Sequence, residues 1–151
     1  TLIGYDTGSN ITSGSNNTCL GNGAVTPSNS STNTIVLGNS SINSLRCQVQ
    51  TISALSDERD KTNIKDSEYG LNIIDSLRPV TFDWNQRDGN RDGLKDLGFI
   101  AQDLQKVDDE HLSFVSDEDP EKLSASYGRL IPVLVKAIQE LKAEIELLKK
   151  K

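Results

Sequence analysis

The sequence contains no methionine, one histidine and two cysteines, and only 5% of its residues are aromatic. It also lacks any apolar run of the roughly 18 residues that a membrane-spanning helix needs, so no membrane insertion is expected. Basic residues are outnumbered, with 16 Lys and Arg against 22 Asp and Glu. Because a phosphate backbone would repel a chain this acidic, nucleic acid is not expected as a partner. The chain starts at Thr1 without a signal peptide, which suggests the end of a longer polypeptide.

Charged residues are almost absent from the first 55 positions, which hold one acid, Asp6, and one base, Arg46. Ser, Thr, Asn and Gly make up 32 of these 55 residues. The net charge of −6 therefore lies entirely in residues 56–151. This shift in composition predicts two different architectures that meet just before Ser56.

A repeat of 17 residues runs through the uncharged part. In each repeat an apolar residue is followed by glycine, at Ile3-Gly4-Tyr5, Leu20-Gly21-Asn22 and Leu37-Gly38-Asn39. A fixed period of this kind favours a stack of thin β-coils, although the polar composition would also suit a flexible linker. Three coils carry little apolar material, so three chains are expected to share one core. We therefore expect repetitive β-structure, a trimeric β-helix or β-roll at the tip of a fibre, over residues 1–55.

The two cysteines, Cys19 and Cys47, lie 28 positions apart, which is not a multiple of 17. Without a CxxC spacing they predict neither a zinc site nor a disulfide framework. We interpret them as buried free thiols.

The charged part has the pattern of a small α+β domain. A short helix is expected over residues 67–77, stopped by Pro79, and an alternating strand over residues 80–84. After a polar turn, an apolar stretch at 98–100 leads into helical spacing at 101–107, and a second short strand is expected at 112–115. Trp84, Tyr127 and the three Phe are interpreted as core anchors.

The last 24 residues, 128–151, predict a long helix with a heptad seam. The seam residues step by three and four and comprise Ile131, Leu134, Ile138, Leu141, Ile145 and Leu148. No sequence remains to cover the last turns, which favours an oligomeric coiled coil over packing on the chain's own domain. Ile at a and Leu at d favours two strands, but about three heptads are too few to decide.

Two candidate sites have simpler explanations. The loop from Asp88 to Asp96 begins like a calcium loop, but Phe99 stands where a bidentate Glu is needed, and a hairpin turn explains the same residues. His111 is the only candidate for a Ser-His-Asp triad and lies in an acidic, exposed-looking turn. We therefore expect no metal and no cofactor.

A third candidate is the pair of Ser56 and Lys61. A serine becomes a nucleophile beside a base, and a lysine can serve once burial leaves it neutral. The two residues are five apart and would lie roughly 16 Å apart in an extended chain, so a turn or a neighbouring subunit would have to join them. From spacing alone a charged surface loop is the simpler interpretation.

Four ordered motifs over residues 54–151 change that interpretation. This part of the chain resembles the C-terminal intramolecular chaperone domain of phage tailspikes and tail fibres, the self-cleaving family known from endosialidases. The matching residues are Ser56-Asp57-x-Arg59-x-Lys61-x-Asn63-Ile64, Leu71-x-x-Ile74-x-x-Leu77-x-Pro79-Val80-x-Phe82-x-Trp84, Gly98-Phe99-Ile100-Ala101-Gln102-Asp103-Leu104, and Tyr127 with the long helix that includes Glu140-Leu141.

The resemblance implies a homotrimeric chaperone that folds the upstream fibre chain and then cuts itself off. The cut would lie between Leu55 and Ser56, with Ser56 as nucleophile and Lys61 as general base, in a single turnover in cis. Residues 56–151 would be the self-cleaving domain, with 128–151 as its coiled-coil helix. The protein would be part of a virion tail fibre or tailspike, assembled in the host cytoplasm, and the cut domain would be released. Alternatives are a trimerisation cap that is never cut and a receptor-binding tip.

Overall fold

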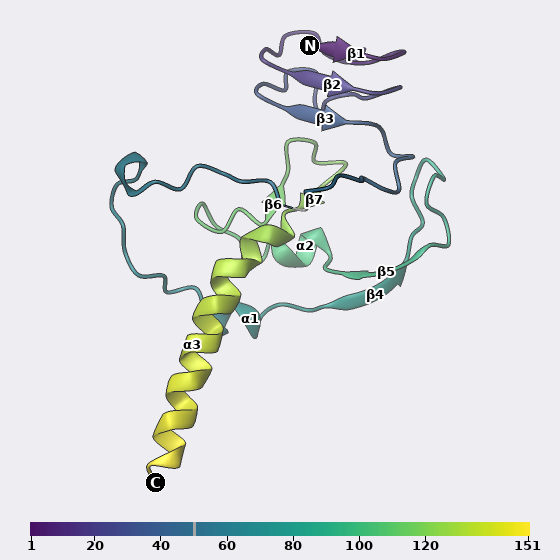
Figure 1. Ribbon diagram of the computed structural model, residues 1–151. Coiled ribbons are helices and arrows are strands. Elements are labelled where there is room, and N and C mark those ends of the chain that lie inside the picture. Colours follow the sequence, from purple (N-terminus) through teal and green to yellow (C-terminus); the bar gives the residue numbers. More distant parts are fainter. Residues whose placement is uncertain (50) are drawn as a thin grey trace. The chain divides into compact units, whose positions relative to one another are not determined.

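A computed structural model describes residues 1–49 and 51–151 of the chain (Figure 1). The chain divides into two compact units. The first unit contains residues 1–43 and 77–130, and the second contains residues 44–76 and 131–151. No helix of the described residues is long and apolar enough to cross a membrane.

The first 43 residues form three stacked coils, each contributing one strand (Figure 1). The strands β1 (Leu2–Ile3), β2 (Thr18–Leu20) and β3 (Ile35–Leu37) form a parallel sheet in that order. Leu2 pairs with Cys19, and Cys19 with Val36, so each partner lies 17 residues further along the chain. The 17-residue period of the sequence is therefore the length of one coil.

Side chains and glycines repeat with the same period. The amide of Asn16 donates to Oδ1 of Asn33 at 2.7 Å, 17 residues on, and Nδ2 of Asn39 donates to the carbonyl of Asn22 at 2.9 Å. Gly4, Gly21 and Gly38 all have positive φ angles. A Cβ on Gly4 would collide with the carbonyl of Gly21, so the coils approach too closely there for any other residue.

The core of the stack is thin. Cys19 and Ala24 are fully buried, whereas many apolar side chains of the strands are exposed, including Leu2, Ile3, Ile35 and Leu37. Cys47, which was predicted to be buried, is exposed, and both cysteines are free. The prediction of buried thiols is therefore wrong for Cys47, because it lies outside the stacked coils.

The rest of the first unit consists of short elements. The hairpin of β4 (Val80–Asp83) and β5 (Lys95–Gly98) is followed by α2 (Ala101–Leu104). A second antiparallel pair, β6 (Val115–Ser116) and β7 (Ser124–Ala125), precedes the 3-10 turn η2 (Tyr127–Arg129). The buried apolar side chains of this region include Leu104, Leu112, Phe114 and Leu130.

The strand expected at 112–115 begins later than predicted. The carboxylate of Asp108 accepts hydrogen bonds from the backbone N–H groups of Phe114 and Val115, at 2.8 and 2.9 Å. Asp109 likewise accepts from the N–H of Leu112. Side chains therefore bond the amides of Leu112, Phe114 and Val115, and the strand is confined to Val115 and Ser116.

Among the aromatic residues, Phe114 is a fully buried core anchor, while Tyr127 is 46% exposed. The Tyr127 ring packs edge-to-face on Phe99, and its hydroxyl accepts the Phe99 N–H at 3.0 Å. A Cβ on Gly98 would collide with the same hydroxyl. The glycine thus makes room for the contact that joins the end of β5 to η2.

The second unit contains the 3-10 turn η1 (Glu58–Asp60) and the short helix α1 (Leu71–Ile74). It also contains all but the first residue of α3 (Leu130–Lys149), a helix of 20 residues. Val133 and Ala137 are buried, whereas the six residues of the predicted seam are between 44% and 66% exposed. The long C-terminal helix is therefore confirmed, and one chain leaves its seam uncovered.

Candidate functional site

A short turn brings Ser56 and Lys61 together. The carboxylate of Asp57 caps η1 by accepting the N–H of Arg59 at 2.9 Å. The Arg59 guanidinium also donates hydrogen bonds to both oxygens of the same carboxylate, at 2.9 and 2.7 Å. Because this turn folds the chain back, two residues that an extended segment would hold far apart become neighbours.

The Lys61 side chain contacts Ser56 at two atoms. Its Nζ donates to the Ser56 Oγ at 2.7 Å and to the Ser56 carbonyl at 3.0 Å. Both residues are exposed, and Leu55, on the other side of the Leu55–Ser56 peptide bond, is 95% exposed. The two side chains are therefore within hydrogen-bond reach of each other, which is the distance condition for a serine and its base.

Charges around the pair are fixed by Asp57 and Arg59. The hydrogen bond from the Arg59 side chain lowers the pKa of Asp57 below its usual value, and the same bond raises the pKa of Arg59. Asp57 therefore stays ionised and occupied with Arg59. This leaves the Lys61 amine with Ser56 as its hydrogen-bond partner.

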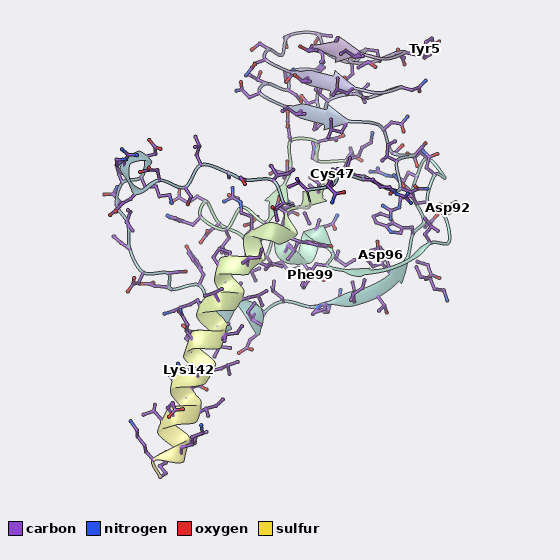
Figure 2. The ribbon with its side chains drawn as sticks, viewed as in Figure 1. Tyr5, Cys47, Asp92, Asp96, Phe99 and Lys142 are labelled. Atoms are coloured by element: carbon purple, nitrogen blue, oxygen red, sulfur yellow. The ribbon has the colours of Figure 1, made fainter. Side chains whose placement is uncertain are left out.

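The Asp88–Asp96 segment lies in the β4–β5 hairpin, over its turn and the first residues of β5, as the simpler interpretation proposed. The N–H of Gly93 donates to the carbonyl of Trp84, which closes the hairpin, and Asp92 and Asp96 lie on its loop and on β5 (Figure 2). The pKa of Asp96 is lowered, first by the Trp84 indole N–H, which donates to its carboxylate at 3.1 Å. Residues 1–49 and 51–151 contain no group of three or more His, Cys, Asp and Glu placed to hold a metal ion.

His111 lies in the turn before β6, as predicted. Its side chain is 70% exposed, and Nδ1 lies 3.9 Å from the carboxylate of Glu110. An imidazole this exposed is in contact with water.

Two contacts were not foreseen in the sequence. In the first unit, Asn90 of the hairpin turn donates to the Ser40 hydroxyl of the last coil at 2.9 Å. In the second unit, the Glu140 carboxylate of α3 accepts the N–H of Leu71 at 2.8 Å, across 69 residues. The sequence placed Glu140 only on the long helix, and no local pattern connects such distant positions.

Comparisons with known proteins agree with the motifs around the Ser56–Lys61 pair. Residues 56–113 match a family model that carries a peptidase name and is described as the chaperone of endosialidase. The chain is also 38% identical over 96 residues to the long tail fiber protein Gp37 of Enterobacteria phage M1 and to the protein of the same name from Enterobacteria phage Ox2.

The alignment covers 62% of this chain but only 38% of each relative, so the chain spans less than half the length of the curated relatives it matches. No solved structure gives a significant match. The match begins at Ser56, where the composition changes. The resemblance that the sequence motifs indicated is thus confirmed by an independent match to the endosialidase-chaperone family.

Proposed function

We propose that residues 56–151 are a trimerisation and folding chaperone for a phage fibre whose end is residues 1–55, and that this domain cuts itself off between Leu55 and Ser56. The observation that carries the proposal is the 2.7 Å contact between Nζ of Lys61 and Oγ of Ser56, next to the bond to be cut. The match to the chaperone family begins at the same serine. The relatives, named as long tail fiber proteins, support a place in the virion tail.

The client of the chaperone would be the stack of coils. Leu2, Ile3, Ile35 and Leu37 are exposed in a single chain, and the stack buries little apolar surface of its own. Three such stacks, packed as a trimeric β-helix, would cover these side chains from water. The hydrogen bond from Asn90 to Ser40 supports direct contact between the chaperone and the last coil.

The long helix would bring the three chains together. Its six seam residues are exposed at heptad spacing, as expected of a coiled coil seen without its partner strands. Ile at a and Leu at d alone would favour two strands, so the choice of three rests on the resemblance to the trimeric family. Holding three chains in register raises their effective concentration for pairing between chains, which is otherwise slow.

The cutting step would use Ser56 and Lys61. A neutral Lys61 amine would take the proton from Oγ, and Oγ would attack the carbonyl carbon of Leu55. The carbon–nitrogen bond would break as Lys61 returned the proton to the Ser56 nitrogen, which leaves an ester between Leu55 and Oγ. Water would hydrolyse this ester to a carboxylate on Leu55 and a fragment that starts with Ser56. Direct attack by water, assisted by the same pair, would give the same two products.

Assembly would switch the pair on. An exposed ammonium holds its proton, whereas removal from water favours the neutral amine that can act as a base. Lys61 is exposed in the single chain, so the desolvating surface would come from neighbouring chains. After the cut the fibre would lack its template and be trapped kinetically in its folded form.

The test is intact-mass spectrometry under denaturing conditions on freshly made protein, with Ser56→Ala and Lys61→Ala chains beside the wild type. We expect two fragments that meet at Leu55–Ser56 from the wild type and one whole chain from each variant, while native mass gives a trimer for all three. A wild-type trimer that stays whole would overturn the self-cleavage and leave a permanent trimerisation cap. A folded monomer would overturn the whole proposal.

A further inference from the structure

A hydrogen bond between Leu71 and Glu140 attaches the end of the segment that carries the Ser56–Lys61 pair to α3. Among residues 44–49 and 51–68, the hydrogen bonds that involve side chains join residues no more than five positions apart. Moving along the chain, the first distant hydrogen bond of this unit given by the structure is from the Leu71 N–H to Glu140. We call residues 51–70 the cleavage arm.

The contact is built specifically around the Glu140 carboxylate. Leu71 is the first residue of α1, so its N–H has no partner within the helix and would otherwise need water. Oε2 of Glu140 accepts this N–H at 2.8 Å, and Lys136, one turn earlier on α3, lies 3.6 Å from the other oxygen. A Cβ on Gly70 would collide with the same carboxylate. The glycine therefore leaves the space that the carboxylate occupies.

Glu140 is also next to the surface that the proposed coiled coil would bury. It lies between Ile138 and Leu141, two seam residues that are 64% and 45% exposed in the single chain. Glu140 itself is half-buried and points at α1 rather than along the seam. The same turn of α3 therefore carries two seam residues, Ile138 and Leu141, and the carboxylate that binds the residue after the cleavage arm.

Lys61 and Leu71 are ten positions apart, which limits the distance between Lys61 and the Leu71–Glu140 bond to about 35 Å. Without this hydrogen bond, α1 would lose an attachment to α3, and the arm that precedes α1 would be held less firmly to the helix. Small misplacements of reacting groups cost large factors in rate, up to about a hundredfold for an ångström.

We infer that Glu140 is a positioning residue for the self-cleavage: it fastens the cleavage arm to the assembly helix, so that formation of the trimer places the Ser56–Lys61 pair. The inference rests on the proposed function and adds to it the residue that couples assembly to cutting. Glu140 touches none of the reacting atoms and acts through the backbone of Leu71.

The experiment follows the cut fraction over time after cell-free synthesis of the full chain, by denaturing mass, with native mass to report the trimer. Glu140→Ala removes the acceptor, and Glu140→Gln keeps an oxygen for the Leu71 N–H. Gly70→Ala displaces the carboxylate without touching α3. Glu144→Ala, one turn further along the exposed part of the same helix, is the matched control.

We expect Glu140→Ala and Gly70→Ala to assemble as trimers and to cut at least about tenfold more slowly than the wild type. Glu140→Gln should cut within about threefold of the wild-type rate, and the control should be unchanged. The double variant Gly70→Ala with Glu140→Ala should be no slower than either single one, because both break one contact. A purely structural role would instead lower the trimer fraction together with the cut, without rescue by glutamine.

Trimers of Glu140→Ala and Gly70→Ala that cut at the wild-type rate would overturn the inference and leave the proposed function standing. A glutamine variant as slow as the alanine variant would also overturn it, because the hydrogen-bond acceptor would then not be what matters. A wild-type trimer that never cuts would overturn the proposed function itself. The two failures are therefore distinguished by the wild type alone.

Discussion

Nζ of Lys61 lies 2.7 Å from Oγ of Ser56, and both side chains are exposed to water. The contact depends on a turn that is capped by Asp57 and stabilised by the ion pair between Asp57 and Arg59, so these two residues hold the geometry of the pair. The contact is therefore present in one chain, whereas burial of the pair is not. The predictions below therefore test the chemistry of the pair and the need for assembly separately.

Lys61→Arg should abolish the cut while leaving the trimer intact. Arginine can keep a charge and a donor near Ser56, but it does not lose its proton in proteins and cannot serve as a general base. Intact-mass spectrometry should give a whole chain, and native mass a trimer. The matched control is Lys65→Arg, in the same exposed arm, which should cut normally. Normal cutting by the Lys61→Arg trimer would contradict the role of base.

Hydroxylamine added during the reaction should be captured at Leu55. If Oγ of Ser56 attacks the adjacent carbonyl, an ester forms, and hydroxylamine converts it to a hydroxamate in place of the free carboxylate. Mass spectrometry of the fragment 1–55 measures the ratio of the two end groups. The Ser56→Ala chain reports any background cleavage by the reagent at Asn22-Gly23. Free carboxylate alone would favour direct hydrolysis by water.

Ile138→Asp should prevent both assembly and cutting. Ile138 is 64% exposed in the single chain, so the substitution costs little within one chain but would bury a carboxylate in the coiled coil. Native mass should change from trimer to monomer, and denaturing mass should show a whole chain. Gln139→Asp, exposed and outside the seam, is the control and should leave both unchanged. Cutting by a monomeric Ile138→Asp chain would show that assembly is not required.

Local patterns in the sequence predicted what local physics determines. The 17-residue period gave the register of Leu2, Cys19 and Val36, because stacked coils must have equal lengths. The heptad spacing predicted the long helix and its exposed seam in the same way. The Ser56–Lys61 pair was found through motif resemblance, since the turn that joins them depends on side-chain bonds of Asp57.

Hydrogen bonds from side chains to the backbone could not be predicted. Asp108 takes the backbone amides of Phe114 and Val115 and delays the strand, although the apolar pattern there is typical of a strand. The bond between Glu140 and Leu71 spans 69 residues, and a glutamate on a helix gives no sign of its partner. Such side-chain-to-backbone bonds leave no periodic signal in a single sequence.

The stability of the first unit should fall in acid through Asp103. The hydrogen bond from Lys106, and then that from Arg78, lowers the pKa of Asp103 below its ordinary value of 3.8. A carboxyl whose pKa is lower in the folded state stabilises that state above its unfolded pKa, and this contribution is lost as the pH falls through the folded value, below about pH 4.

Thermal unfolding at about pH 6 and about pH 3 should therefore show a larger drop in midpoint for the wild type than for Asp103→Asn, which has no charge to lose. Asp92→Asn is the control, because the described part of the chain gives Asp92 no hydrogen bond or ion pair. Its unfolding midpoint should fall between the two pH values by as much as that of the wild type. Equal drops for the wild type and Asp103→Asn would contradict the assignment.

Gly21→Ala should destabilise the stack of coils by more than backbone strain alone. Gly21 has a φ of +117°, which costs an L-residue about 1–2 kcal/mol. Its added Cβ would also lie 3.2 Å from the Cα of Gly38, so the next coil would have to shift. Gly89→Ala in the β4–β5 loop, with a φ of +74° and nothing within 4 Å of the added Cβ, isolates the strain. Urea unfolding of Ser56→Ala chains, which stay joined, should give a larger loss for Gly21→Ala than for Gly89→Ala. Equal losses of unfolding free energy in the two variants would mean that the coils can move apart at Gly21 without cost. Close stacking at the 17-residue repeat would then not be what stabilises this part of the chain.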